Sequence, residues 1–543
     1  MSNNSVRILC RVFVCLLLFI SPLQASESEP SVALATINQS IAVELDRRAK
    51  LPGGKTQKKR LGEINAYYKA NEYKPVWLSD NKPTQKARQL IQLLRRAPED
   101  GLNPADYDVE ALFQKVNIYD PATQADFDVH LSNAFVAYAQ HLNVGRVDPS
   151  SVTRENVIYP AALSVETILN QGKSTSNIIA YSRLLAPHTP RYQRLRSALS
   201  QYRGIAANGG WDRIEEGEVL KPGMEDDRVP GLRKRLAVSG DYKGALDIQS
   251  TLYDELLVKA VKYFQWRHGL DVDGVIGGNT LKQLNVLVED RIAMMEYNLE
   301  RRRWMQDDYG SYYIFANLAD QVVKVVKNEK TLHAELIQVG LPYHRTPVFT
   351  DEMEYIEINP YWNVPKSIAT NELLPKLKQN PGKLASQNYE VLSNGNVISP
   401  TAVSWGNYSK GNFPFRLRQR PGEGNALGRI KFMFPNTFNV YLHDTPSKSN
   451  FDKSSRFFSH GCLRLQDPLK MAEVLLGAQG WDRARINGVV ASKKRTVVKL
   501  EKTIPVHIAY LTSWVNKDGS VHFRRDVYER DTVLGKALSN AGS

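Results

Sequence analysis

The residues of this chain that are best suited to chemistry lie in one short segment, residues 459–464, which reads Ser-His-Gly-Cys-Leu-Arg. The chain has three cysteines, and two of them, Cys10 and Cys15, fall in an apolar N-terminal segment typical of a removable leader. Exported proteins usually pair their cysteines, so a single remaining thiol is either a tolerated buried residue or one kept for its reactivity. The small polar residues ahead of Cys462 favour a tight turn that exposes a thiol in a cleft. We therefore predict that Cys462 is a nucleophile.

A thiol attacks as its thiolate, so Cys462 needs a base or a cation beside it. Two histidines are close in sequence, His443 and His460. His460 is two residues from Cys462 and would point to the same side of an extended chain, but it cannot easily approach the sulfur in line. His443 is therefore the predicted general base. The alternative is that His443 is an ordinary loop histidine.

The sequence around the two residues indicates how they would meet. Residues 437–443 read Thr-Phe-Asn-Val-Tyr-Leu-His, and their β-branched and aromatic side chains predict a strand that ends at His443. A loop over residues 444–455 follows, after which the chain returns to Cys462. A strand that ends in His443 and a returning segment that ends in Cys462 would set both side chains at one end of a sheet.

These residues resemble the signature of the L,D-transpeptidases, cell-wall enzymes of the YkuD fold, in which a histidine, a variable spacer and the pattern S/T-H-G-C-x-R/N form the active site. Further stretches agree in order, at residues 338–342, 346–347, 358–365 and 425–432. Together they are similar to the large YcbB-type subgroup over most of the mature chain. The resemblance implies a nucleophile, Cys462, a general base and acid, His443, and supporting motif residues that shape the turn and bind substrate or backbone: Ser459, His460, Gly461 and Arg464.

Residues 1–25 have the composition of a signal peptide. Arg7 and Arg11 precede an apolar stretch, and Ala25 supplies a small residue at a plausible cleavage point. The apolar stretch is about half of the roughly 20 residues that span a bilayer. We therefore expect a cleaved leader and an exported protein, which the YcbB-like resemblance places in the periplasm. An uncleaved inner-membrane anchor that faces the periplasm is the alternative.

The chain is basic, with a formal net charge of +14 and a pI near 9.4. Such a charge suits nucleic acid, a membrane surface or an acidic polymer. Export disfavours nucleic acid, whereas peptidoglycan stem peptides carry carboxylates that fit the charge; a merely solvated surface would look the same. The basic run at residues 301–303 leaves membrane proximity open, but positive charges at a helix C-terminus also suit the helix dipole, which we prefer.

The chain is predicted to be a multidomain α+β protein, because 543 residues exceed the size of one core. Apolar residues at helical spacing predict a helical scaffold domain over 26–210. A helical hairpin around an Asp-Gly turn resembles the peptidoglycan-binding type 1 module and is assigned to 228–290. Strand patterns predict a β-rich catalytic domain over 310–500, with an insertion at about 366–424 that the resemblance makes a cap over the cleft. Residues 501–543 are predicted to be a C-terminal extension.

The resemblance implies a peptidoglycan L,D-transpeptidase that forms 3→3 cross-links, with acyl transfer from a tetrapeptide stem to Cys462 and release of D-Ala. Two alternative functions remain open. One is a carboxypeptidase or endopeptidase that uses water as acceptor, and the other is a catalytically inactive wall-binding protein. A zinc site of His443, His460 and Cys462 lacks an evident fourth ligand, and we predict neither a metal nor a cofactor. The predicted partners are peptidoglycan stem peptides and not nucleic acid. The sequence does not decide whether the acceptor of the acyl group is a stem peptide, a lipoprotein or a D-amino acid. It predicts no oligomeric state.

Overall fold

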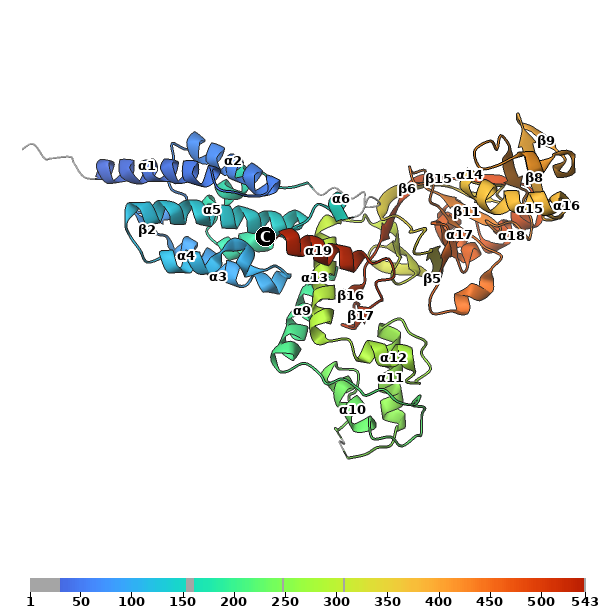
Figure 1. The fold of residues 1–543 in the computed structure, drawn as a ribbon, viewed down its shortest axis with the longest axis horizontal. Coiled ribbons are helices and arrows are strands. Elements are labelled where there is room, and N and C mark those ends of the chain that lie inside the picture. Colours follow the sequence, from blue (N-terminus) through green and yellow to red (C-terminus); the bar gives the residue numbers. More distant parts are fainter. Residues whose placement is uncertain (1–29, 153–160, 247–248, 306–307, 542–543) are drawn as a thin grey trace, which may run out of the picture.

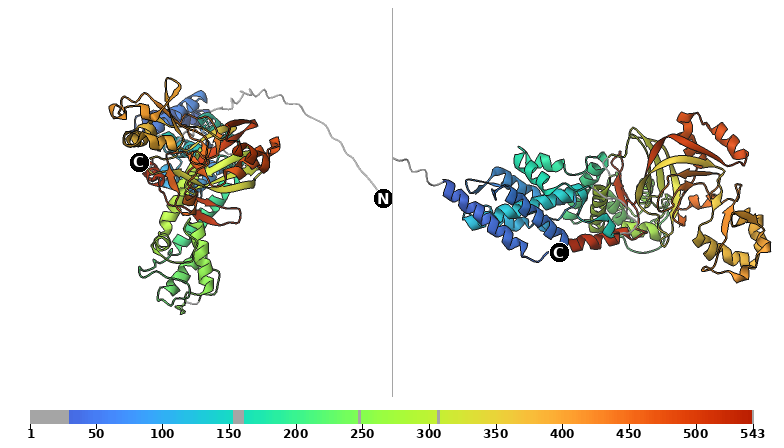
Figure 2. Two further views of the ribbon diagram at one scale, coloured as in Figure 1. Left: turned by 90° about the vertical axis from the view of Figure 1, so that its right-hand side faces the viewer. Right: turned by 90° about the horizontal axis from the view of Figure 1, so that it is seen from above.

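The computed structural model describes residues 30–152, 161–246, 249–305 and 308–541. A helical body and a β-rich body lie at opposite ends of the molecule, and a small helical module projects from between them (Figure 1). A view turned about the horizontal axis shows the same separation of the two bodies (Figure 2). The predicted multidomain α+β fold is thus confirmed. The predicted leader, residues 1–25, lies outside the described residues.

The helical body corresponds to the predicted scaffold. Its helices and one short hairpin are α1 (Pro30–Ala49), α2 (Lys55–Ala70), β1 (Leu78–Ser79), β2 (Lys82–Pro83), α3 (Gln85–Arg95), α4 (Val109–Lys115), α5 (Pro121–Val144), α6 (Pro149–Val152), α7 (Val165–Ser174), α8 (Ile178–Arg183) and α9 (Pro190–Ala207). The Asp120 side chain caps α5 and Pro121 occupies its first position, as expected for a helix start. The apolar residues that predicted α5 are all buried: Phe127, Leu131, Phe135, Tyr138 and Leu142. The core of this body therefore forms around α5.

The projecting module consists of α10 (Val229–Val238), α11 (Glu255–Arg267) and α12 (Gly278–Leu284), which share one apolar core. The Gln265 side chain of α11 holds the turn that leads to α12. Its Nε2 donates to Asp273 Oδ1 at 2.8 Å, and its Oε1 accepts from the Gly274 N–H at 2.8 Å. The predicted helical hairpin around an Asp-Gly turn is therefore present, and Asp273 serves in the turn.

Helix α13 (Val288–Trp304) runs from this module to the β-rich body. The main sheet there has the order β13-β5-β14-β12-β11-β6-β15-β3-β4, and β5 also pairs with β4, so the sheet closes on itself. Its strands are β3 (Tyr312–Asn317), β4 (Val322–Lys327), β5 (Lys330–Gly340), β6 (Phe349–Ile358), β11 (Ile430–Met433), β12 (Leu442–His443), β13 (Phe457–Ser459), β14 (Leu463–Leu465) and β15 (Thr496–Ala509). Helices α17 (Pro468–Leu476) and α18 (Arg483–Ala491) pack beside it. The helix predicted after the motif begins as expected, because the Asp467 side chain caps α17.

The insertion between β6 and β11 forms a subdomain with its own apolar core. Its elements are β7 (Trp362–Asn363), α14 (Lys366–Ile368), a π-helical turn (Ala369–Leu373), α15 (Leu374–Gln379), α16 (Pro381–Ser386), β8 (Tyr389–Ser393), β9 (Asn396–Ile398) and β10 (Arg416–Gln419). The four strands make a separate sheet in the order β7-β10-β8-β9. We call residues 362–419 the cap subdomain.

Strand β15 crosses the boundary predicted at residue 500. It pairs with both β6 and β3, so residues 501–509 belong to the main sheet. The register shifts between Lys499 and Ile504, and this bulge with its polar, exposed residues hides the continuity of the strand in the sequence. Only the residues after β15 extend beyond the sheet: the hairpin of β16 (Ser513–Val515) and β17 (Val521–Phe523), and helix α19 (Arg530–Ala541).

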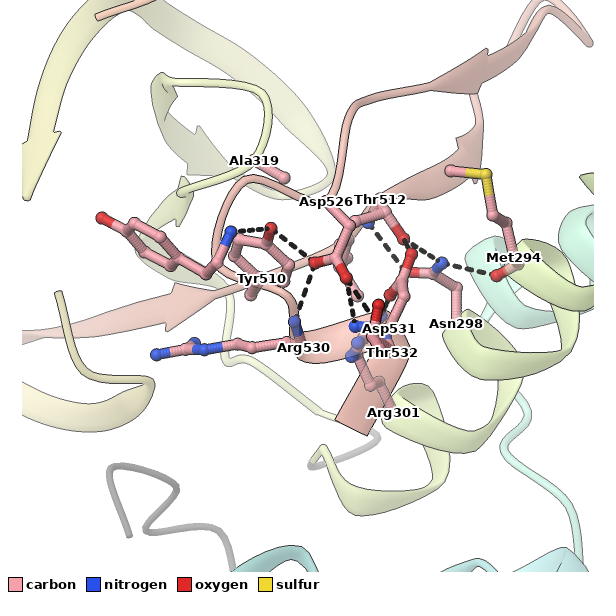
Figure 3. Close-up of polar contacts among 12 residues, drawn as sticks. Met294, Asn298, Arg301, Ala319, Tyr510, Thr512, Asp526, Arg530, Asp531 and Thr532 are labelled. Atoms are coloured by element: carbon pink, nitrogen blue, oxygen red, sulfur yellow. Dashed lines mark hydrogen bonds and ion pairs between the residues drawn. The ribbon is translucent and has the colours of Figure 1, made fainter. Parts of the chain in front are cut away.

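This C-terminal segment returns to the scaffold side of the molecule and packs on α13. Arg301 forms an ion pair with Asp531 at 2.5 Å, and the Asn298 side chain donates to Thr512 Oγ1 at 2.7 Å (Figure 3). The Thr512 N–H donates back to Asn298 at 2.9 Å. These polar contacts therefore hold the C-terminal segment against α13. Within the described ranges, no helix combines the length and the apolar character needed to cross a membrane.

Candidate active site

Three neighbouring strands of the main sheet carry the candidate residues. Strand β12 pairs with β11 and β14 in a register that sets His443 opposite Lys431 on one side and opposite Arg464 on the other. Leu442 and Leu463 are paired in the same ladder and are fully buried in the core. Because side chains alternate across a strand, Lys431, His443 and Arg464 lie in one row on the opposite face. The sheet thus sets two cations beside the predicted base.

Cys462 directly precedes β14 and lies on the same face as His443. The Leu463 N–H donates to the Tyr441 carbonyl at 3.1 Å, so the backbone hydrogen bonds between the two strands begin next to Cys462. Tyr441 and Cys462 are two residues before His443 and Arg464, so the alternation gives them the same face. The structure therefore places His443 and Cys462 on the same face of two adjacent strand segments.

Residues 437–443 do not form the long strand predicted for them, because only Leu442–His443 is a strand. The Asn436 side chain closes a turn instead, since its Oδ1 accepts from the Phe438 and Val440 N–H groups at 3.1 Å each. Asn439 adopts a φ of +54°, which ends an extended run. Side-chain hydrogen bonds to backbone compete with strand pairing, and here they override the strand propensity of the aromatic and β-branched residues. The short strand nevertheless ends at His443, as expected.

The motif forms a tight turn around the Ser459 side chain. Ser459 Oγ accepts from the Gly461 N–H at 3.0 Å and donates to the Cys462 carbonyl at 2.6 Å. Thr346 Oγ1 donates to the Gly461 carbonyl at 2.8 Å, and Gly461 has a φ of +118°, which residues with side chains rarely adopt. Because Ser459 engages the Gly461 N–H, this turn offers the Cys462 N–H, rather than the Gly461 N–H, to a ligand beside the thiol.

The His443 imidazole is buried and oriented by a backbone group. Its Nδ1 donates to the Asp444 carbonyl, which leaves Nε2 as the nitrogen able to accept a proton. Burial and the positive charges of Arg464 and Lys431 lower the pKa of His443 to about 3. His443 is therefore a neutral imidazole near pH 7.

The Asp444 carboxylate does not orient His443. It accepts from the Arg429 N–H at 2.8 Å and pairs with Lys448 at 2.8 Å. The carboxylate thus holds the neighbouring loops in place, and the backbone carbonyl of the same residue contacts the imidazole.

The Cys462 thiol is half-buried. It donates to the Asn439 carbonyl at 3.8 Å. Burial raises the pKa of Cys462, and the rise is opposed by hydrogen bonding from Tyr441 and by the charges of Lys431 and Arg464. Lys431 Nζ lies 4.0 Å from the centroid of the Tyr441 ring. Neither Tyr441 nor Lys431 was predicted from the sequence as part of the site, although the two-residue spacing of Tyr441 and His443 was a signal that they share a face.

We expect the reactivity of Cys462 to rise with pH without a step near neutrality. The raised pKa of Cys462 and the lowered pKa of His443 describe a neutral thiol–imidazole pair, so the thiolate forms only as the pH passes the thiol pKa, above its usual value of about 8.5. The check is the rate of iodoacetamide alkylation, followed by mass spectrometry from pH 5 to 10. A plateau of high reactivity between pH 5 and 7 would instead reveal a thiolate–imidazolium pair.

Replacement of Tyr441 by phenylalanine is expected to slow alkylation of Cys462 at pH 8 by about 2- to 10-fold. The loss of the hydroxyl raises the thiol pKa further, and each unit of pKa costs about tenfold in thiolate at a pH below it. Tyr408→Phe, in the cap subdomain, is the matched control and should leave the rate unchanged. An equal effect of both variants would show that Tyr441 has no specific influence on the thiol.

His460 contacts the cap subdomain. Its Nε2 lies 2.8 Å from Glu372 Oε1, and its ring packs against His344 with centroids 5.0 Å apart. Glu372 belongs to the π-helical turn that opens the cap subdomain. The His460 imidazole therefore joins the motif to the cap subdomain. Among the described residues, no group of three His, Cys, Asp or Glu side chains is arranged to hold a metal ion.

Three parts of the chain match known families. Residues 62–199 match a family described as "Scaffold domain", residues 225–284 one described as "Putative peptidoglycan binding domain", and residues 311–508 one described as "L,D-transpeptidase catalytic domain". The fold and these matches define a multidomain protein in which one segment is similar to L,D-transpeptidase catalytic domains and another to putative peptidoglycan binding domains. The chain contains a YkuD L,D-transpeptidase catalytic domain and a peptidoglycan-binding type 1 domain, which confirms the resemblance drawn from the motifs.

A protein of Haemophilus influenzae described as "Putative L,D-transpeptidase" is 33% identical to this chain over 262 residues. The match covers 48% of this chain and 52% of the relative, so the chain spans about half the length of that protein.

Two solved structures also match, at low similarity. One is an L,D-transpeptidase from Xylanimonas cellulosilytica, with 13% identity, a TM-score of 0.16, and coverage of 54% of this chain and 98% of that one. The other is a fused zinc-dependent amidase/peptidase with a peptidoglycan-binding domain from Clostridium acetobutylicum, with 11% identity, a TM-score of 0.14, and coverage of 54% and 100%. At these TM-scores the two structures carry no argument about this chain.

Proposed function

We propose that this protein is an exported peptidoglycan L,D-transpeptidase that uses Cys462 as nucleophile and His443 as general base and acid. The observation that carries the proposal is the pairing of β12 with the segment around β14, which puts a neutral, backbone-oriented imidazole and a lone thiol on one face of the sheet. Both residues belong to the segment that matches the catalytic domain. The match to a peptidoglycan-binding domain supports the same polymer as partner.

In the first half-reaction the thiol is acylated. His443 Nε2 takes the thiol proton while Sγ attacks the carbonyl carbon of the residue that precedes the terminal D-Ala of a tetrapeptide stem. The oxyanion that forms accepts a hydrogen bond from the Cys462 N–H. The C–N bond then breaks, His443 returns its proton to the leaving amine, and D-Ala departs. The donor stem remains as a thioester on Cys462.

In the second half-reaction an amine consumes the thioester. The side-chain amine of a second stem attacks the thioester carbonyl, and His443 accepts the proton that the amine loses. The C–S bond breaks, the thiolate of Cys462 regains a proton from His443, and a 3→3 cross-link is released. Lys431 and Arg464 offset the negative charge of the thiolate leaving group.

The proposal is tested by mass spectrometry of the mature protein incubated with disaccharide-tetrapeptide. A cross-linked dimer with loss of one D-Ala, absent with Cys462→Ala, is the expected product. Loss of D-Ala without dimer would identify a hydrolase that uses water as the acceptor. If the peptide binds, stays unchanged and never acylates Cys462, the protein is a wall-binding protein without this activity.

A further inference from the structure

The last turn of α13 carries three consecutive arginines, and two of them form ion pairs. Arg301 pairs with Asp531 at 2.5 Å (Figure 3), and Arg303 pairs with Glu300 at 3.0 Å. Arg302 between them is only 7% exposed, yet among the described residues its side chain has neither an ion pair nor a hydrogen bond. A buried guanidinium without a counter-ion is strongly unfavourable. The position of Arg302 therefore calls for an anion that the described residues do not supply.

Arg302 lines a cavity of about 200 Å³ where the scaffold, the main sheet and the C-terminal hairpin meet. Four further cations line the same cavity: Arg191, Arg194, Lys324 and Lys517. Its two carboxylates are Asp320 and Glu329. Asp320 pairs at 2.6 Å with Arg524, a residue that does not line this cavity. The side chain of Glu329 is 65% exposed and lies 3.6 Å from Arg191. Positive charge is thus in excess inside the cavity.

The arginines of the cavity act on one another. Burial, and to a smaller extent the charges of Arg191 and Arg194, lower the pKa of Arg302 to about 10. Burial and the charge of Arg191 likewise lower the pKa of Arg194, whose Nε donates only to the Val515 carbonyl at 3.3 Å. Like charges that lie close together repel, and a bound anion between them would remove the repulsion.

We propose that this cavity binds a small multivalent oxyanion of the phosphate class. Guanidinium groups match the geometry of phosphate oxygens through paired hydrogen bonds, and several of them together favour a multivalent anion over a single carboxylate. Arg191 and Arg194 come from α9, Arg302 from α13 and Lys324 from β4. A bound oxyanion therefore ties the scaffold and the linking helix to the main sheet. No residue of the thiol motif lines the cavity, so the proposal is independent of the proposed activity.

The test is calorimetric titration of the mature protein with inorganic pyrophosphate at constant ionic strength, together with its thermal unfolding. Native protein is expected to bind pyrophosphate and to unfold several degrees higher in its presence. Arg302→Met should weaken binding by at least about tenfold and abolish the thermal shift. Without anion, Arg302→Met should unfold no earlier than native protein, because the uncompensated charge is gone.

Three comparisons sharpen this test. Arg194→Gln changes another wall of the cavity and should also weaken binding, which covers the case in which Arg302→Met fails to fold. Arg213→Gln removes an equal charge from an exposed position away from the cavity and should bind as native protein does.

Inorganic phosphate represents a free anion, and glycerol 3-phosphate represents a phosphate carried on an organic group. Binding of either supports the proposal, and the ligand that binds more tightly identifies the source. No binding of pyrophosphate, equal binding of acetate, or unchanged binding by both cavity variants would overturn it.

Discussion

Glutamine in place of His443 is expected to lower the rate of thioester formation at Cys462 by about 10²- to 10⁴-fold, the usual contribution of a general base. The neutral imidazole accepts the thiol proton, and glutamine keeps a polar group of similar size that cannot take one. Because Nδ1 is held by a backbone carbonyl, the substitution removes the base without breaking a side-chain network. The measurement is the appearance of the acylated protein by rapid-quench mass spectrometry.

Two controls define this experiment. His460→Gln should change the rate only slightly, because His460 pairs with Glu372 at a solvent-exposed position rather than with the thiol. Cys462→Ala should abolish the acylated species altogether. If the acylation rate falls more in His460→Gln than in His443→Gln, the general base is not His443, and the proposed mechanism is wrong.

Methionine in place of Arg267 is expected to destabilise the peptidoglycan-binding module by about 3–5 kcal/mol, because it leaves a buried carboxylate without its partner. Arg267 forms a doubly hydrogen-bonded ion pair with Asp241, and both side chains are buried. Its Nη1 also reaches the Tyr202 hydroxyl of α9 at 3.5 Å and the Val521 carbonyl of β17 at 3.1 Å. One side chain therefore connects the module, the scaffold and the C-terminal hairpin.

The free energy of unfolding is measured by urea titration with tryptophan fluorescence, to which Trp266 next to Arg267 contributes as one of the eight tryptophans of the chain. The double variant Arg267→Met with Asp241→Leu should recover most of the lost stability, because it removes both charges together. Lys234→Met, which breaks the exposed pair with Asp212, is the matched control and should have little effect. If Arg267→Met is as stable as this control, the buried pair does not hold the junction.

Many local elements of this molecule could be predicted from the sequence, because helix starts and buried helix faces depend on residues that lie close together in the chain. The spacing of Phe127, Leu131 and Phe135 predicted a buried helix, and Asp467 followed by proline predicted the start of α17. His443, the Ser-His-Gly-Cys motif and the further stretches that follow the same order together indicated the L,D-transpeptidase catalytic domain, since such a pattern depends on residue types and not on their surroundings. A local conflict produced the main error, because the Asn436 side chain replaced a predicted strand by a turn.

Contacts between distant segments required the tertiary structure. The strand β15 passes through a predicted domain boundary because its pairing with β3 and β6 compensates for a polar bulge. The register of β11, β12 and β14 brings Lys431 and Arg464 to His443, where burial and these two charges lower the pKa of the imidazole. The surroundings of the three arginines on α13 could not be predicted from the sequence either. The helix dipole accounted for all three in the same way, whereas in the structure two of them form ion pairs and Arg302 lines a cavity.

The sequence by itself thus determined which residues can do chemistry and which local elements carry them. The tertiary structure decided what surrounds each of those residues, because burial, charge and hydrogen-bond partners depend on segments far apart in the chain.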